Sequence, residues 1–329
     1  AFSEVTVDGG TLSGGRVSAP AVSAIDGGVL TTAGPTGLFL DITGVVVVDA
    51  SSRIDVTGKG RPRPSAPLPG GGSYGGLAGI YSPGYDPNPV YGDYADPDEP
   101  GTGGASHAGG GLVRLTASAL RLDGDLLAAG DGGISAQFPG SGGGIYVAVA
   151  TLSGAGRITA PGGYGGYAGG GGRVAVYAGD FSGFDASRIT APSGGGNPTA
   201  GAGTVYLRDT DDPRGTLVID AGSGESGPTP LGLPGQNTFV IPDDLVVRGS
   251  ANVRPEHAGM AIDVRGSLVV QGGARLTGLD GTLLVSGAIR VESGALLGVT
   301  GSLAAFSEVT VDGGTLSGGR VSAPAVSAI

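Results

Sequence analysis

A short acidic stretch has the residue types that could hold a metal ion. Within YGDYADPDEP, the carboxylates of Asp93, Asp96, Asp98 and Glu99 lie close together along the chain, and calcium takes six to eight hard oxygen ligands of this kind. The twelve-residue calcium loop and the glycine-rich nonapeptide calcium repeat are both missing from the sequence. The spacing therefore favours a solvated acidic turn, with calcium as the one cofactor that these residues suggest.

The same part of the chain is rich in tyrosine. Residues 59–108 interrupt the pattern of the surrounding sequence and contain five of the ten tyrosines, namely Tyr74, Tyr81, Tyr85, Tyr91 and Tyr94. Tyrosine can pack on a neighbouring surface while its hydroxyl still forms hydrogen bonds. These side chains are predicted to contact a second strand of a filament or a carbohydrate. The alternative is a flap that covers its own chain.

Residues for catalysis are scarce. Cleavage of a polysaccharide needs two carboxyl groups at a fixed separation, whereas Asp123, Asp125 and Asp131 belong to one glycine-rich turn region. The histidines, His107 and His257, stand among small residues, no serine elbow accompanies them, and the chain has no cysteine. The sequence predicts that the protein is not an enzyme and leaves a polysaccharide-degrading enzyme as the least favoured alternative.

The composition points to a folded, repetitive protein. The 329 residues include 71 Gly and 22 Pro, yet 39% are hydrophobic and only 14% are charged, so there is apolar surface to bury. A net charge of −11 repels phosphate groups, which argues against nucleic acid as a partner. No apolar run of about 18 residues occurs, so no membrane span is expected in this segment, and any export signal is expected to lie outside it.

A long repeat defines the organisation of the chain. The 25 residues AFSEVTVDGGTLSGGRVSAPAVSAI occupy positions 1–25 and again 305–329. Identity of that length indicates a periodic polymer with a 304-residue unit, and the alternative is an isolated protein with matching ends. The junction residues of two such units are predicted to be Phe2, Val5 and Val7, with their equivalents Phe306, Val309 and Val311.

Shorter repeats predict the fold class. GSLVVQGGARL from Gly266 aligns with GAIRVESGALL from Gly287, and longer copies begin at Gly109, Gly142, Gly170 and Gly201. Each copy alternates apolar and polar residues between glycine turns. This pattern predicts an all-β, parallel β-helix solenoid that is right-handed, carries glycine-rich loops and has one long insertion. Some twelve to fifteen coils at roughly 4.8 Å each would make a unit on the order of 60–70 Å long.

These repeats divide the chain into six predicted parts. They are β-helix coils at 1–58, the insertion at 59–108, coils with glycine-rich loops at 109–220, a Gly/Pro-rich loop at 221–244, shorter coils at 245–304, and the start of the next unit at 305–329.

Two finer expectations follow from the alignment of the longer copies. The glycine loops that start near Gly130, Gly162 and Gly194 should lie side by side, either as close-packed polyproline II-like segments or as flexible bristles. Arg157 and Arg188 occupy matching positions in successive copies, and Arg53 precedes Ile54 in the same way. Because two adjacent arginines would repel, an acid between them or exposure to solvent is expected.

Several of these motifs carry a resemblance. GGGRVAVY, SRITAPSGGG, GAGTVYLRD and GSLVVQGGARL together resemble the giant tandem-repeat β-helix surface proteins of bacteria, broadly akin to filamentous-haemagglutinin-like adhesins. The resemblance implies an extracellular, cell-surface fibre whose partners are further copies of the same repeat, in one chain or as a homopolymer, with lateral filament contacts or a glycan in addition. We therefore expect a structural repeat unit of a filament; the alternative is an adhesin that binds carbohydrate or another surface ligand through residues 59–108.

Overall fold

The computed structural model describes residues 4–62, 70–79, 86–105, 107–197, 199–224 and 226–329. Over these residues the chain is rich in β-strands, and the one helix among them is the three-residue η1 (Ala186–Arg188). The strand-rich, nearly helix-free class expected from the sequence is therefore confirmed. No helix in these ranges is long and apolar enough to span a membrane. Phe2, Tyr81 and Tyr85 lie outside the described residues.

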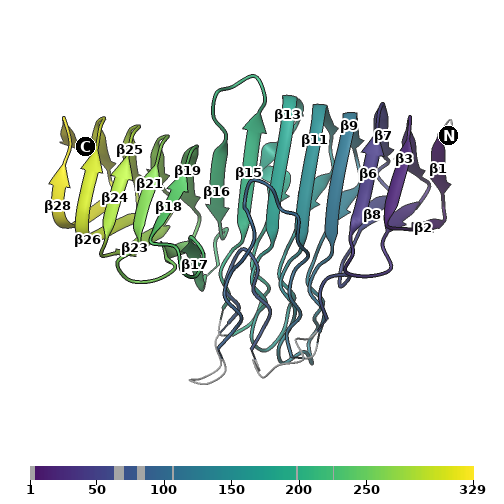
Figure 1. Ribbon diagram of the computed structural model, residues 1–329, viewed down its shortest axis with the longest axis horizontal. Helices are drawn as coiled ribbons and strands as arrows, with labels where there is room; N and C mark the ends of the chain where they lie inside the picture. The colour runs from purple at the N-terminus through teal and green to yellow at the C-terminus, as the bar shows by residue number, and fades with distance from the viewer. Residues whose placement is uncertain (1–3, 63–69, 80–85, 106, 198, 225) are drawn as a thin grey trace.

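One sheet of fifteen strands, sheet A, runs along the whole molecule (Figure 1). Neighbouring strands in this sheet are, in spatial order, β1 (Val5–Asp8), β4 (Val22–Ile25), β7 (Val45–Val48), β9 (Leu112–Leu122), β11 (Gly144–Gly154), β13 (Arg173–Phe184), β15 (Thr204–Asp209), β16 (Thr216–Asp220), β19 (Asp244–Arg248), β22 (Leu268–Val270), β25 (Ile289–Glu292), β27 (Val309–Asp312) and β29 (Val326–Ala328). Two further strands, β3 (Arg16–Ala19) and β6 (Leu38–Ile42), pair with each other and join the sheet at β9.

Two smaller sheets accompany sheet A. Sheet B consists of β14 (Ile189–Thr190), β12 (Arg157–Thr159), β10 (Asp125–Leu127), β8 (Arg53–Asp55), β5 (Val29–Thr31) and β2 (Thr11–Ser13). Sheet C consists of β17 (Pro228–Leu231), β20 (Asn252–Pro255), β23 (Arg275–Leu279), β26 (Leu296–Ala305), β24 (Thr282–Val285), β21 (Ala261–Val264) and β18 (Thr238–Ile241), with β28 (Thr315–Ser322) beside β26.

Segment 221–244 differs from the sequence expectation. It was predicted to be a Gly/Pro-rich loop, yet it contributes β17 and β18 to sheet C. Pro228 and Pro230 are tolerated in β17 because that strand lies at an edge of the sheet, where a missing N–H leaves no neighbour unbonded.

Apolar side chains of successive strands form continuous columns. In sheet B, one column places Leu30, Ile54, Leu126, Ile158 and Ile189 at matched positions of five neighbouring strands. All five are at most 3% exposed, and the strands lie about 4.8 Å apart, so each side chain packs on the next. Full burial of one such side chain contributes about 1.5–3 kcal/mol to folding.

Sheet A reverses direction once. Its strands pair in parallel except at β15 and β16, which pair antiparallel through Val205↔Val218 and Tyr206↔Leu217. The copy that begins at Gly201 was predicted to add another parallel coil. It forms a hairpin instead, and its turn, TDDPRG at 210–215, projects from the top of the molecule in Figure 1.

The apolar core changes sides of sheet A at the same hairpin. Val205 and Val218 belong to the core of the N-terminal half, whereas Tyr206 and Leu217 belong to that of the C-terminal half. Opposed residues of an antiparallel pair share a face, and consecutive residues of a strand point to opposite faces. The N-terminal core therefore packs on one face of sheet A and the C-terminal core on the other.

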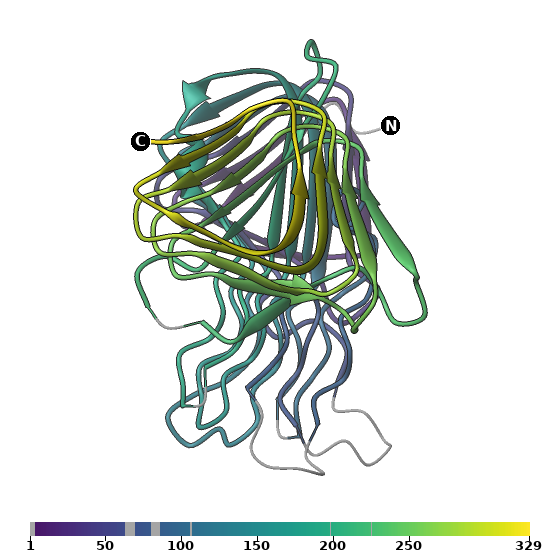
Figure 2. The ribbon, with the colours of Figure 1, turned by 90° about the vertical axis from the view of Figure 1, so that its left-hand side faces the viewer.

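The glycine-rich segments form a lobe that projects below the strands of sheet A in Figures 1 and 2. This glycine lobe consists of residues 70–79, 101–105, 128–144, 160–172, 191–197 and 199–203. Its backbones run side by side, and four consecutive N–H groups donate to three different neighbours: Gly169 to the carbonyl of Gly163, Gly170 to Gly72, Gly171 to Gly201 and Gly172 to Ala160.

The hydrogen bonds of the lobe repeat every third residue. Gly169 and Gly172 donate to the same segment, at 3.1 and 2.9 Å, while the two residues between them donate to two other segments, at 3.0 Å each. Three residues per turn is the repeat of a polyproline II helix. The segments thus lie side by side, as the sequence predicted, and the bonding pattern matches its close-packed alternative.

Candidate functional site

A short segment of the 59–108 insertion crosses the outer face of sheet A. The Tyr177 hydroxyl on β13 donates to the carbonyl of Ala95 at 2.8 Å. Arg114 Nη1 on β9 donates to Asp96 Oδ1 at 2.7 Å and to the Pro97 carbonyl at 3.0 Å. We call residues 91–99 the strap; in Figure 1 it lies in front of sheet A near β13 and β15.

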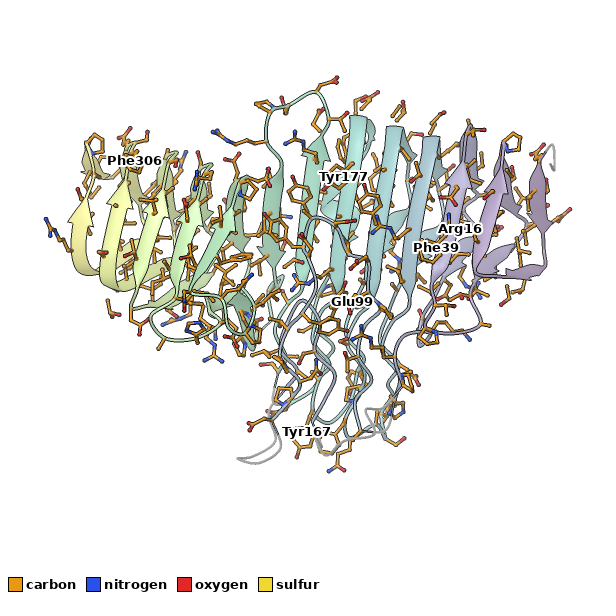
Figure 3. All side chains as sticks on the ribbon, viewed as in Figure 1. Arg16, Phe39, Glu99, Tyr167, Tyr177 and Phe306 are labelled. Carbon is orange, nitrogen blue, oxygen red and sulfur yellow. The ribbon has the colours of Figure 1, made fainter. Side chains whose placement is uncertain are left out.

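The strap meets a row of arginine and aromatic side chains that runs along the molecule. Successive members contact through a guanidinium over a ring, through in-register pairing or through ring contacts: Arg16–Phe39 (4.9 Å), Phe39–Arg114 (paired), Arg114–Tyr146 (4.1 Å), Tyr146–Tyr177 (5.4 Å), Tyr177–Tyr206 (5.5 Å), Tyr206–Tyr94 (5.5 Å) and Tyr94–Phe239 (6.1 Å). Arg16 and Phe39 lie together at one end and Tyr177 lies near the middle (Figure 3).

The far end of this row opens into a pocket. The seam pocket, with a volume of about 550 Å³, lies where the core changes sides of sheet A. Its lining includes Tyr94, Tyr206, Phe239, Arg173, Asp243 and Gln236. Val240, which also lines the pocket, is 43% exposed.

Arg173 is a buried cation in the wall of the seam pocket. The residue is 5% exposed, its Nε donates to the Tyr91 carbonyl at 2.8 Å, and its Nη1 donates to Thr204 Oγ1 at 3.2 Å. Among the described residues, no carboxylate oxygen lies within 4 Å of its guanidinium. Burial lowers the pKa of Arg173 below its ordinary value.

The two acids that line the pocket, Asp93 and Asp243, already have partners, and Asp93 accepts the Ala95 N–H at 2.8 Å. Asp243 is 5% exposed; its Oδ1 accepts a hydrogen bond from the Gly215 N–H at 2.8 Å and lies 3.8 Å from Arg208 Nη1. Burial, reinforced by the charge of Asp243, raises the pKa of Tyr206 to about 12. The tyrosine hydroxyl therefore keeps its proton near neutral pH and remains a donor.

The four predicted calcium ligands do not converge. Asp93 accepts the Ala95 N–H at 2.8 Å, Asp96 pairs with Arg114, and Glu99 pairs with Arg61, while Asp98 is exposed. Within the described ranges no cluster of three or more His, Cys, Asp or Glu residues is arranged to hold a metal. The sequence did not reveal that two of these acids, Asp96 and Glu99, form ion pairs with arginines.

The predicted surface tyrosines face inward where the structure describes them. Tyr74 is fully buried and Tyr94 is 7% exposed, which corrects the expectation that these two form an outer contact surface. The Tyr91 ring contacts the Tyr74 ring with the two centroids 4.6 Å apart, and its hydroxyl donates to the Pro100 carbonyl at 2.7 Å. These residues match the alternative of a flap over its own chain, because the Tyr74 and Tyr91 rings contact each other and the Tyr94 ring contacts Tyr206 of sheet A, while the buried Tyr74 hydroxyl has no hydrogen-bond partner among the described residues.

The arginine expectation is confirmed, by exposure to solvent for one pair and by an acid for the other. Arg157 and Arg188, which precede the paired residues Ile158 and Ile189, have side chains 59% and 50% exposed. Asp125 stands between Arg53 and Arg157 in neighbouring strands of sheet B. Arg157 Nε and Nη2 donate to the two carboxylate oxygens of Asp125 at 2.7 and 3.1 Å, and this bond raises the pKa of the arginine.

The two copies of the duplicated segment pair alike. Val5 on β1 is matched with Val22 on β4, and Val309 on β27 with Val326 on β29. Val7 and Val309 are buried, Val5 and Val311 are half-buried, and Phe306 is 67% exposed.

The C-terminal copy also shows what lies below the segment. Val309 and Val311 are in register with Ile289 and Val291 of β25, and Leu316 is in register with Leu297 of β26. The N-terminal copy shows what lies above, since Leu12, the equivalent of Leu316, is in register with Leu30. Both neighbours of the duplicated segment are thus defined within one chain.

Comparisons with protein-family models, curated proteins and solved structures find no match to this chain. The site is therefore interpreted from its own residues. The sequence missed Arg173, Tyr206 and Asp243, although a signal was available for one: Tyr146, Tyr177 and Tyr206 recur near the start of three successive glycine-led copies.

Proposed function

We propose that the protein is a structural repeat unit of an extracellular bacterial filament or giant surface fibre, in which units continue end to end through the duplicated 25 residues. In this proposal each half is a β-helix, and sheet A joins the two halves. The proposal rests on the resemblance of its motifs and on the pairing of the duplicated segment.

The observation that carries the proposal is the continuity of apolar columns across the duplicated segment. Leu276, Leu297 and Leu316 follow one another in register, and Leu12, the equivalent of Leu316, continues to Leu30. An array of units would therefore bury each end of one unit against the next and leave no unpaired sheet end between them, where pairing with foreign chains is the hazard.

The length of one unit follows from sheet A. Eleven steps separate β1 from its equivalent β27 along the sheet, which at about 4.8 Å per step is about 53 Å. This is shorter than the 60–70 Å expected from the sequence, because residues of the glycine lobe and the strap extend sideways rather than adding coils.

A polypeptide of two consecutive 304-residue units tests the proposal. Electron microscopy and small-angle X-ray scattering should find one continuous rod that is longer than the single unit by about 53 Å. A matched variant with Val309→Asp at the internal junction places a charge in the buried column and should separate the rod into two jointed particles. Two freely jointed particles in the unmodified two-unit chain would refute end-to-end continuity.

The mass of the native polypeptide under denaturing conditions distinguishes the two ways of building the fibre. A mass many times 31.6 kDa indicates a covalent array of units, and a mass near one unit indicates separate subunits that meet at the duplicated segment.

A further inference from the structure

The seam pocket contains a buried charge, Arg173, whose guanidinium lies 5.5 Å from the centre of the Tyr74 ring but which has no carboxylate within 4 Å among the described residues. Taking a guanidinium out of water is costly unless an anion or a full set of acceptors replaces the water. The two hydrogen bonds of Arg173 use Nε and Nη1, and neither of them involves Nη2. A carboxylate in the pocket would supply the charge-assisted hydrogen bond that guanidinium groups make best.

The other residues that line the pocket suit a sugar ring as the rest of the ligand. The rings of Tyr94, Tyr206 and Phe239 line the pocket, and aromatic faces pack against the nonpolar C–H face of a pyranose ring. Gln236 and the tyrosine hydroxyls provide donors and acceptors for sugar hydroxyls. A volume of about 550 Å³ lies within the range of small-molecule sites, which is roughly 300–1,000 Å³.

We propose that the seam pocket binds a uronic-acid residue of an acidic saccharide, with the Arg173 guanidinium on the carboxylate and the aromatic rings against the sugar. The anion is favoured over a cation because both acids of the lining already have partners, Asp93 in the Ala95 N–H and Asp243 in Gly215 and Arg208, whereas Nη2 of Arg173 donates no hydrogen bond to a described residue. The site is independent of filament formation, so either proposal can fail alone.

The charge of the whole protein determines the form of the ligand to test. A net charge of −11 repels a long polyanion at a distance, so a short oligosaccharide is the suitable probe. The closest neutral comparison is the galactose trisaccharide, which differs from the galacturonic acid trisaccharide by having a hydroxymethyl group in place of each carboxylate.

Isothermal titration calorimetry of the full chain with both trisaccharides, in buffer with a calcium chelator, tests the proposal. The acidic trisaccharide should bind at least tenfold more tightly than the neutral one, and Arg173→Gln should remove at least tenfold of that affinity. Arg290→Gln is the matched control, because it removes the same charge from an arginine that is 54% exposed and does not line the pocket. It should leave the affinity unchanged.

A second variant keeps the test decisive if Arg173→Gln does not fold, as judged by circular dichroism. Phe239→Ala removes a half-buried ring of the pocket and should weaken both trisaccharides at least fivefold. Equal binding of the two trisaccharides, or binding unchanged by Phe239→Ala, would overturn the proposal. Release of shorter sugars from the acidic trisaccharide would also overturn it, in favour of a polysaccharide-cleaving site.

Discussion

Replacing one glycine of the glycine lobe should unfold it locally, while replacing another should have almost no effect. A Cβ added to Gly203 would lie 1.9 Å from the carbonyl oxygen of Gly172, which real structures do not tolerate. That same oxygen accepts the Thr204 N–H at 3.1 Å, so moving it away also breaks a buried hydrogen bond. Gly133 is the matched control, since a Cβ there meets nothing within 4 Å.

The magnitudes separate the two variants clearly. For Gly203→Ala, overpacking costs about 1–3 kcal/mol and the lost hydrogen bond costs about 1–3 kcal/mol. The loss of freedom in the unfolded chain offsets only about 0.4–1 kcal/mol of this. Gly203→Ala should therefore destabilise the protein by about 1–5 kcal/mol, whereas Gly133→Ala should be neutral or stabilising by up to about 1 kcal/mol.

Urea denaturation followed by circular dichroism measures this difference, and hydrogen exchange of the lobe amides locates it. In Gly203→Ala, the amides of residues 169–172 should exchange faster, because the N–H groups of Gly170 and Gly171 donate to other segments of the lobe and those of Gly169 and Gly172 donate to the beginning of segment 160–172. If the two variants had the same midpoint and the same exchange, the close-packed three-residue repeat would be an incorrect description of the lobe.

Three further changes test other parts of the structure. Leu30→Ala opens a cavity in a fully buried column and should cost about 2–5 kcal/mol in the same urea assay. Hydrogen bonds from the side chain of Ser52 and the backbone of Asp26 lower the pKa of Asp49 to about 2. The stability that ionised Asp49 supplies is therefore complete above about pH 4 and is lost as the pH falls towards 2. The melting temperature of Asp49→Asn should accordingly lie below that of the unmodified protein at pH 7, and the two melting temperatures should converge near pH 2. Tyr177→Phe removes the hydrogen bond to the Ala95 carbonyl and should speed proteolytic cleavage within the strap without a comparable change in melting temperature; unchanged cleavage would mean that this bond does not hold the strap.

The local features of the fold could be predicted because they depend on neighbours at fixed spacing. Alternating apolar residues produce strands with one buried face, and this holds for the column that contains Leu126 and Ile158. The acid between Arg53 and Arg157 followed from aligning successive copies, because like charges in adjacent strands repel. The side-by-side packing of glycine loops followed from the same alignment.

The reversal of sheet A could not be predicted in that way. Residues 216–220, TLVID, alternate equally well whether the strand runs parallel or antiparallel to its neighbour. The direction of β16 depends on the turn at 210–215. The move of the apolar core from one face of sheet A to the other depends on both faces of β15 being apolar. The seam pocket was missed for a related reason, since Tyr94, Arg173 and Phe239 are far apart in sequence and meet only because the strap and the hairpin bring them together.

The single antiparallel pairing of β15 with β16 has a consequence for the symmetry of a fibre. In β27 the chain runs opposite to β1 within sheet A, and its core lies on the opposite face. A unit that has both its strand direction and its core face reversed is related to the preceding unit by a half-turn about the long axis of the molecule. The gradual twist of the sheet adds a smaller rotation. An array of these units would therefore have an approximate two-fold screw axis, with glycine lobes projecting alternately to opposite sides and a true axial repeat of two units, about 106 Å.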